Sequence, residues 1–219
     1  MALVNERVRI LENECVGPNL YLMTLSSPAI AAAIEPGQFV HMKIPGMEGH
    51  VLRRPFSVYA ADAAGGTLDV LYQTVGFGTN HLAALAPDVD NEIESAELIG
   101  PVGRRWQAPA GTQRALLVGG GVGVPPLYNL AKRLLADGRE VAVVLGFNTA
   151  AEVFYRDEFA QLGCRVVVAT ADGTEGVRGF VTDAIRESGL AYDYFYACGP
   201  LPMLRALSDA TKCSGQLSF

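Results

Sequence analysis

The chain has 219 residues, half of them apolar and 18% charged, a composition that supports a packed core and argues against a disordered protein. Its net charge of −6 and isoelectric point near 5.1, with no basic block, make nucleic acid and anionic membrane surfaces poor partners. No apolar run reaches the roughly 18 residues of a membrane-spanning helix, and the charged N-terminal stretch lacks a signal-peptide core, so we expect a cytoplasmic protein.

Residues 1–104 predict an antiparallel β-barrel or sandwich, because short β-branched and aromatic runs alternate with Gly and Pro. The expected strands are residues 8–12, 20–25, 39–44, 56–60, 68–74 and 93–99. A short helical segment over residues 79–85 follows the fifth strand, with Thr79 as its candidate N-cap.

Residues 105–219 predict a doubly wound parallel α/β domain, because apolar strands alternate with amphipathic helices. The domain boundary is expected in the Gly- and Pro-rich segment 101–112. The expected strands are residues 115–118, 141–145, 165–169 and 194–197. The expected helices are residues 127–135 (closed by Gly138), 151–162 and 180–187, and a last one that begins near Pro202. The apolar helix faces are expected to contain Leu127, Leu130, Leu134 and Leu135 in the first helix, and Phe180, Val181, Ala184 and Ile185 in the third.

The segment RRPFS, residues 53–57, leads into one of the expected strands. A flavin ring binds along a strand whose backbone can hydrogen-bond to its rim, and a hydroxyl and a cation near the ring stabilise its reduced form. Ser57 is the candidate hydroxyl and Arg54 the candidate cation. Taken alone, the segment also fits a surface strand that begins with two solvated arginines.

The segment YQTVGFGT, residues 72–79, has two glycines in a turn. Without side chains at Gly76 and Gly78, backbone N–H groups can point at a diphosphate, and the helix expected at Thr79 favours an anion at its N-terminus. The alternative is an ordinary hairpin turn. Together with RRPFS, the segment indicates a flavin site.

A glycine cluster, Gly119, Gly120, Gly121 and Gly123, lies between a buried strand and a helix. Glycines in such a turn let a dinucleotide backbone approach closely. The spacing is not Gly-x-Gly-x-x-Gly, since Val124 occupies the sixth position, so the strict dinucleotide fingerprint is not met. A purely structural tight turn is the alternative.

The segment CGPLPM, residues 198–203, follows the last expected strand. Cys198 stands at the carboxyl end of that strand, where ligands bind in open α/β sheets, and Gly199 and Pro200 turn the chain away. Cys198 is therefore a candidate to lie beside a nicotinamide ring. Its alternative is that of a small buried residue, which is the usual environment of a free cysteine.

Two loops of the second half contain weaker candidates. The segment 146–152 has no Arg or Lys to meet a 2′-phosphate, which favours NAD over NADP, and Arg156 is the one nearby cation. Asp172 and Glu175 are loop carboxylates for which a ribose contact and simple solvation are both open.

The four cysteines are Cys15, Cys164, Cys198 and Cys213, widely spaced and without a Cys-x-x-Cys pair. They predict neither a zinc site nor a disulfide framework, and a reducing compartment fits them best. The three histidines also lack the spacing of metal ligands, so we expect no metal site.

Seven segments in this order resemble the electron-transfer subunit family of NAD-linked dihydroorotate dehydrogenase, within the ferredoxin reductase-like superfamily. They are RRPFS, YQTVGFGT, LIGPVG, LLVGGGVGVPPL, VLGFNTAAEVFYRDEF, VATADGTEGVRGFVTD and CGPLPM. The resemblance covers nearly the whole chain. RPFS, GGGVGVPP and CGPxPM are shared with other oxidoreductase subunits of the superfamily, whereas ATADGTEGVRGFVTD is similar to the dihydroorotate branch.

The resemblance implies an FAD-binding barrel over residues 1–104 and an NAD-binding α/β domain over residues 105–219. It implies FAD contacts from Arg54, Pro55, Phe56, Ser57, Leu71, Tyr72, Gln73, Gly78 and Thr79. It implies NAD contacts from Gly120, Gly121, Val122, Gly123, Cys198, Gly199 and Pro200, and it gives Ser57 and Cys198 positions at the reacting rings.

The resemblance also implies a partner and a pathway. An FMN-containing catalytic subunit would oxidise dihydroorotate in pyrimidine biosynthesis, and electrons would reach NAD through FAD. Family members also bind a 2Fe–2S cluster through four clustered cysteines just after a segment like GQLSF, and such a group is absent from this sequence. The rival interpretations are a stand-alone NAD(P)H:ferredoxin or flavin oxidoreductase and a truncated module that binds nucleotides and a partner without passing electrons.

Overall fold

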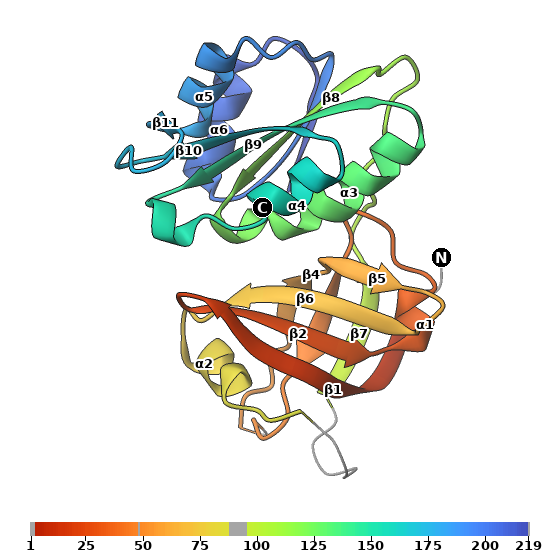
Figure 1. The fold of residues 1–219 in the computed structure, drawn as a ribbon. Helices are drawn as coiled ribbons and strands as arrows, with labels where there is room; N and C mark the ends of the chain where they lie inside the picture. The colour runs from red at the N-terminus through yellow and green to blue at the C-terminus, as the bar shows by residue number, and fades with distance from the viewer. Residues whose placement is uncertain (1–2, 48, 88–95, 219) are drawn as a thin grey trace. The chain divides into compact units, whose positions relative to one another are not determined.

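The computed structural model describes residues 3–47, 49–87 and 96–218, in two compact units that divide between Arg105 and Trp106 (Figure 1). Each unit encloses its own hydrophobic core. We describe the two units one at a time.

The first unit is a seven-stranded antiparallel sheet in the order β4-β3-β7-β1-β2-β6-β5, which curls into a half-barrel (Figure 1). The strands are β1 (Val4–Gly17), β2 (Leu20–Ser26), β3 (Phe39–Lys43), β4 (Arg54–Ser57), β5 (Ala60–Asp62), β6 (Thr67–Gln73) and β7 (Ala96–Val102). Two short helices, α1 (Pro28–Ala31) and α2 (Phe77–Ala83), complete the unit. The expected antiparallel β-architecture is confirmed.

The half-barrel core follows the two-residue period of its strands, which sends alternate side chains to one face. Val8 and Ile10 of β1 are buried, as are Leu68, Val70 and Tyr72 of β6. On the other face of β6, Asp69 is half-buried and Gln73 is exposed, although Leu71 on that face is buried. Alternation therefore fixes which face of each strand a ligand can reach.

Four predicted boundaries in this unit were wrong. β1 is much longer than residues 8–12, because its first part pairs with β7 and its second part with β2. The expected strand 56–60 is two strands, since β4 ends at Ser57 and β5 begins at Ala60. The sixth strand runs from Ala96 to Val102, and residues 93–95 of its predicted range lie outside the described residues. The helix α2 begins at Phe77, ahead of the predicted Thr79.

The second unit has a six-stranded parallel sheet in the order β11-β10-β9-β8-β12-β13. The strands are β8 (Arg114–Gly120), β9 (Glu140–Phe147), β10 (Arg165–Thr170), β11 (Val177–Arg178), β12 (Tyr194–Cys198) and β13 (Gly215–Ser218). The helices are α3 (Pro125–Ala136), α4 (Arg156–Gln161), α5 (Val181–Ser188) and α6 (Leu201–Ala210), with short 3₁₀ turns η2 (Gly121–Gly123) and η3 (Ala150–Glu152).

Helices cover both faces of this sheet (Figure 1). Leu127 and Leu134 of α3 pack with Phe159 of α4 on one face, whereas Val181 of α5 packs with Leu204 of α6 on the other. The β8 and β12 strands are neighbours, and the helices that follow them lie on opposite faces. The predicted doubly wound parallel fold is confirmed, and its switch point, where ligands bind in such sheets, lies between β8 and β12.

Two predictions for this unit were wrong in detail, and two strands were missed. The helix expected over residues 151–162 is interrupted, because Val153 is extended and Tyr155 adopts a left-handed conformation before α4. Phe180 is not on the buried face of α5, since it is the N-cap residue and 70% exposed. The two-residue β11 and the edge strand β13 were not predicted.

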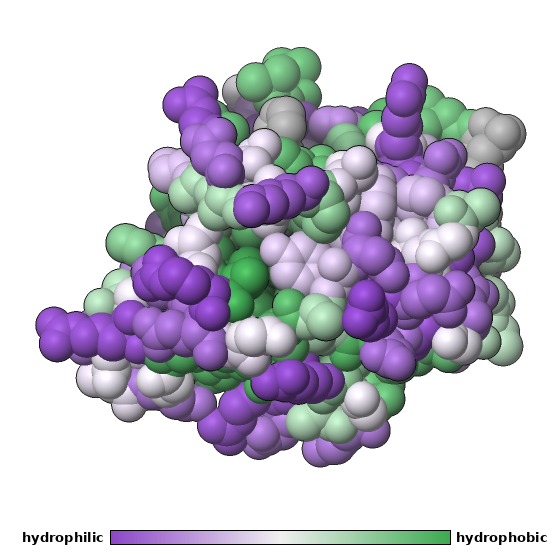
Figure 2. All heavy atoms as spheres, turned by 90° about the horizontal axis from the view of Figure 1, so that it is seen from above, coloured by the Kyte–Doolittle hydropathy of each residue, from purple (hydrophilic) through white to green (hydrophobic). Residues whose placement is uncertain are grey.

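No helix in the described residues is long and apolar enough to cross a membrane. The face shown in Figure 2 is mainly hydrophilic, with hydrophobic residues in small areas and in one hollow between them.

Candidate functional site

The glycine turn after β8 and the end of β12 meet at the carboxyl edge of the parallel sheet. The strands pair so that Gly119 lies beside Cys198. A Cβ atom on Gly123 would lie 2.2 Å from the Cys198 carbonyl oxygen, so only glycine fits there. The structure therefore brings together the two segments that the sequence predicted to form one site.

The other glycines of this site have different surroundings. Gly199 lies against the backbone of Gly120, and Gly120 lies under Met203 and Pro200. Gly121, in contrast, has a positive φ of 52° and no atom within 4 Å of where a Cβ would be. The turn is therefore packed against β12 on one side and open on the other, where Gly121 and the 44% exposed Val122 lie.

Cys198 is buried at the end of β12, and burial raises the pKa of its thiol to about 11. The Ser218 side chain of β13, paired beside it in register, forms a hydrogen bond that lowers the pKa and only partly opposes the burial. The thiol is therefore neutral near pH 7 and unsuited to act as a nucleophile. Sequence reasoning missed Ser218, because a four-residue edge strand near the end of the chain leaves almost no pattern.

Two loops continue this edge beyond β9 and β10. The Ala171 N–H donates to the Phe147 carbonyl at 3.0 Å, and the Ala150 N–H donates to the Thr174 hydroxyl at 2.8 Å. These bonds hold the two loops together. Asp172 accepts hydrogen bonds from the Thr174 hydroxyl and N–H, which lower the pKa of its carboxyl.

In the first unit, β4 is an edge strand, so one side of its backbone pairs with no other strand of the described residues. Ser57 ends β4 opposite Phe39 and is half-buried. Pro55 is exposed, whereas the Phe56 side chain is buried in the core. Ser57 and the exposed backbone edge are thus the parts of RRPFS that a ligand can meet most directly.

The strand β6, which lies between β2 and β5 in the sheet, contributes less than its predicted residues suggest. The Leu71 and Tyr72 side chains are buried, and the Tyr72 hydroxyl donates to the Asn13 side chain at 2.9 Å. Gln73, the last residue of β6, is exposed. A ligand here would contact backbone groups of β6 and the Gln73 side chain.

The two arginines of RRPFS have separate roles. Arg53 donates to the Glu97 carbonyl and carboxylate at 2.9 and 2.8 Å, and this ion pair lowers the pKa of Glu97. Arg54 donates to the Leu52 carbonyl, and its Nε lies 3.1 Å from where a Cβ of Gly78 would be. Arg53 is therefore structural, and the Arg54 guanidinium lies at the start of α2.

The turn before α2 is held by Thr79, the third residue of the helix. Its hydroxyl accepts from the Val75 and Gly76 N–H groups at 2.9 and 3.3 Å and donates to the Gly76 carbonyl. Gly76, not Thr79, is the N-cap residue. A Cβ on Gly76 would have no neighbour within 4 Å, so the turn leaves open space beside it.

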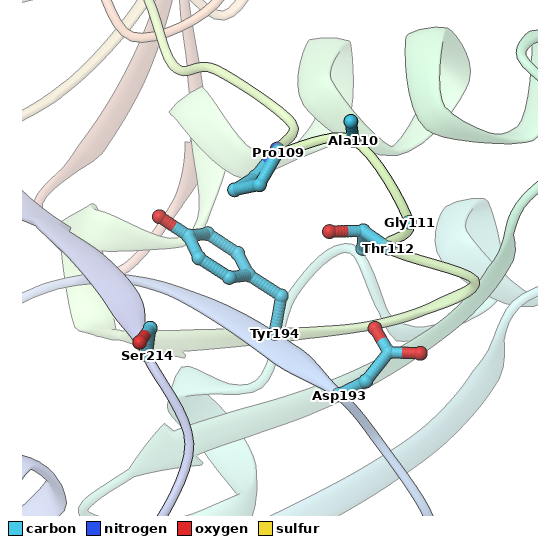
Figure 3. Close-up of a pocket in the computed structure, with 7 residues that line it drawn as sticks. All are labelled: Pro109, Ala110, Gly111, Thr112, Asp193, Tyr194 and Ser214. Carbon is cyan, nitrogen blue, oxygen red and sulfur yellow. The ribbon is translucent and has the colours of Figure 1, made fainter.

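A separate pocket of about 300 Å³ lies at the amino ends of β8 and β12 (Figure 3). In the close-up the Tyr194 ring extends toward Pro109, with the Asp193 carboxylate on the other side near Thr112. Asp193 accepts from the Gln113 and Arg114 N–H groups. The pocket lies at the opposite edge of the sheet from the glycine turn and takes no part in that site.

Comparison with known proteins places these features in a family. The profile described as an oxidoreductase NAD-binding domain matches residues 117–209, which include both the glycine turn and the end of β12. The chain is 44% identical over 207 residues to the dihydroorotate dehydrogenase B (NAD(+)) electron transfer subunit of Bacillus caldolyticus, covering 93% of this chain and 78% of that protein. It is 41% identical over 220 residues to the subunit of the same name from Fusobacterium nucleatum, covering 98% and 83%.

Solved structures show the same fold. An NADH-dependent reduced ferredoxin-NADP oxidoreductase matches with a TM-score of 0.78 and 28% identity, over 92% of this chain and 71% of that one. The cytochrome b5 reductase domain of Ulva prolifera nitrate reductase matches with a TM-score of 0.77 and 18% identity, over 97% of both chains. The half-barrel followed by a parallel α/β unit is thus a ferredoxin reductase-like fold.

Proposed function

The chain belongs to the family of dihydroorotate dehydrogenase B (NAD(+)) electron transfer subunits, and from this premise we propose that it binds FAD on the half-barrel and NAD(H) on the α/β unit. The domains proposed for them are residues 1–104 and 105–219. The observation that carries the proposal is the junction of the glycine turn with the end of β12, at the sheet edge where dinucleotides bind.

The proposed NAD(H) site uses Gly120, Gly121, Val122 and Gly123 for the diphosphate and Cys198, Gly199 and Pro200 for the nicotinamide. The open side of the turn at Gly121 gives a diphosphate access to the backbone, and the packed side fixes the turn in place. Cys198 offers a neutral, apolar surface for the ring, because burial keeps its thiol protonated. Its proposed role is therefore packing, with no proton or electron pair supplied.

The proposed FAD site uses the exposed edge of β4, the end of β6 and the turn before α2. Its residues are Arg54, Pro55, Phe56, Ser57, Leu71, Tyr72, Gln73, Gly78 and Thr79. Phe56, Leu71 and Tyr72 contribute backbone groups, since their side chains are buried in the core. FAD supplies the exchange between one-electron and two-electron transfer. Ser57 would hold a hydrogen bond at the reacting part of the ring, and Arg54 would place positive charge near it.

The relatives are named as subunits, which supports a partner. We propose an FMN-containing dihydroorotate dehydrogenase catalytic subunit, so that electrons from dihydroorotate reach NAD⁺ through this chain in pyrimidine biosynthesis. All four cysteines are free in the structure, which is compatible with the reducing cytoplasm where we place the complex.

The test begins with the purified chain. Its flavin is extracted and identified by chromatography, and NADH is then added anaerobically while flavin absorbance is followed. We expect FAD and rapid bleaching by NADH. Recovery of FMN alone, with FAD unable to replace it, would contradict the FAD site, and a flavin-loaded chain that NADH cannot bleach would contradict the NAD(H) site.

A second measurement separates the proposal from a stand-alone reductase. Orotate formation linked to NAD⁺ is measured for the electron transfer subunit with and without the FMN-containing catalytic subunit. Coupled turnover is expected in the complex. Steady NADH oxidation with a soluble acceptor, unaffected by the partner, would favour the stand-alone enzyme.

A further inference from the structure

Arg156, the first residue of α4, is held between two carboxylates. Its Nε donates to Asp157 Oδ1 at 2.9 Å, and its Nη1 donates to Glu175 Oε1 at 2.6 Å. These contacts raise the pKa of Arg156, with the Asp157 hydrogen bond as the largest cause. The guanidinium is therefore charged but already committed to two acceptors.

This carboxylate clamp, defined as Arg156, Asp157 and Glu175, lies at the carboxyl edge of the parallel sheet. Arg156 follows β9, and Glu175 belongs to the loop after β10, so both come from segments that leave the sheet at the edge where the glycine turn lies. In open α/β sheets a dinucleotide extends along this edge, and its adenosine ribose lies past the glycine turn. The clamp thus lies at the expected position of the adenosine ribose 2′ group of the proposed nucleotide, where NAD and NADP differ.

Other charges along this edge are mostly negative. Within the loop segments 146–156 and 171–180 the cations are Arg156 and Arg178, and the Arg178 side chain packs over Gly173. Glu152 accepts from the Asn148 backbone and side-chain N–H groups. The hydrogen bonds to Asp172 keep that carboxyl charged, because they lower its pKa. A 2′-phosphate arriving beside Arg156 would meet the Asp157 and Glu175 carboxylates that already pair with this guanidinium.

We propose that Glu175, supported by Asp157, sets the preference of this chain for NAD(H) over NADP(H) by occupying Arg156. Removal of the Glu175 charge would free one side of the guanidinium to bind a phosphate. Glu175 is thus a specificity-determining residue that acts through Arg156. This inference rests on the proposed NAD(H) site.

The expected effect is modest, because the pair is partly solvated. The Arg156 and Glu175 side chains are 49% and 28% exposed, and ion pairs of this kind contribute little to folding. Replacing Glu175 should therefore leave the fold intact. We expect an affinity gain for NADP⁺ of about two- to fivefold, the size typical of one surface charge contact.

The test measures NAD⁺ and NADP⁺ binding by calorimetry, and flavin reduction by NADH and NADPH, for the wild type and Glu175→Gln. We expect Glu175→Gln to bind NADP⁺ about two- to fivefold more tightly, with a smaller change in NAD⁺ binding. Asp157→Asn should give a smaller gain. In the double variant Arg156→Gln/Glu175→Gln the gain should disappear.

Glu187→Gln is the matched control, since it removes one negative charge near the end of α5, which leads back to the other edge of the sheet. It should leave both affinities unchanged. A Glu175→Gln protein that binds NAD⁺ normally without any gain in NADP⁺ affinity would contradict the proposed role of the clamp in cofactor preference. So would a gain that persists in the double variant. Absence of NAD⁺ binding in the wild-type chain would instead overturn the proposed function on which the clamp rests.

Discussion

Single residues decide how the sheet edge is built. Gly123 lets the turn after β8 reach the carbonyl of Cys198, and no side chain is tolerated there. A Cβ at Gly120 would instead meet the flexible Met203 side chain at its sulfur first and Pro200 second. Two glycines in one turn therefore impose different constraints.

We expect Gly123→Ala to destabilise the protein by about 1–3 kcal/mol, the usual cost of overpacking a site with a rigid backbone neighbour. Gly120→Ala should cost clearly less, because the Met203 side chain can rotate away. Urea titration followed by circular dichroism gives both values. Equal costs for the two variants would contradict this account of the turn.

Ser57→Ala should slow flavin reduction by NADH roughly ten- to hundredfold, while FAD binding changes less. The physical reason is the loss of one hydrogen bond that strengthens as the ring is reduced, about 1–3 kcal/mol. Stopped-flow measurement on flavin-replete protein provides the rate. An unchanged rate in a fully loaded variant would remove Ser57 from the reaction.

Two buried thiols predict how stability changes at alkaline pH. Burial raises the pKa values of Cys164 and Cys198 from 9.0 to about 11. Between these pH values the unfolded thiols lose their protons first, so the free energy of unfolding falls as pH rises from 9 to 11, by about 2 kcal/mol for each thiol. Cys164→Ala should make this fall shallower in urea titrations between pH 9 and 11.

At the scale of elements, α5 shows how a helix start is fixed by a residue inside the helix. The Asp183 carboxylate accepts the Phe180 N–H at 2.9 Å, and the Asp183 N–H donates to the Phe180 carbonyl. The two bonds close the first turn from both directions. Arg186 adds an ion pair to the same carboxylate at 2.7 Å.

Asp183→Ala should lower the melting temperature by about 2–4 °C at neutral pH. The Phe180 hydrogen bond, and then Arg186, lower the pKa of Asp183 below its ordinary 3.8. The stabilisation is therefore present above about pH 4 and is lost as pH falls through the lowered pKa. Thermal melts from pH 2.5 to 7 test this, with Arg186→Ala as the control that keeps the capping bond. A constant difference between wild type and Asp183→Ala down to pH 2.5 would contradict it.

Most elements could be predicted from periodicity, because their apolar positions face one core. The exceptions have local causes. Residues 151–162 contain helix-forming residues, yet the Phe154 ring packs on Phe147 at 5.0 Å and Tyr155 packs near Tyr128, which draws the chain out of helical conformation. Phe180 looked like a core residue, but the carboxylate of Asp183 makes it the N-cap.

The candidate site, like the fold, was only partly predictable from the sequence. The glycine turn and the Cys-Gly-Pro turn were predictable as neighbours, since both follow strands that end at one edge of a sheet. The carboxylate clamp on Arg156 was not predictable, because Glu175 reaches it through a loop whose conformation depends on several side-chain hydrogen bonds. Sequence spacing gives no account of such a contact.

For the whole molecule, the positions of the cysteines predict its spectrum. Cys15 lies in the half-barrel, Cys164 precedes β10 at the amino edge of the parallel sheet, and Cys198 ends β12 at the opposite edge. An iron–sulfur cluster needs four thiolates close together. The described residues, which include all four cysteines, contain no cluster of three or more potential metal ligands.

We therefore expect the 219-residue chain to show flavin absorbance without the broad visible bands of a 2Fe–2S cluster, even after anaerobic reconstitution. NADH should still bleach the flavin. Iron and acid-labile sulfide analysis provides the measurement, with a protein of known 2Fe–2S content as the positive control. Stoichiometric iron and sulfide on this chain would overturn the prediction.

The contact between Gly123 and Cys198 also limits how this protein can be re-engineered. Because one backbone segment rests on the other with no side chain between them, neither can change its path unless the other changes with it. A chimera that imports only the turn after β8 from a distant reductase would place a foreign loop against an unmatched strand end. Successful grafts should exchange residues 118–126 and 197–203 together, as one interchangeable part.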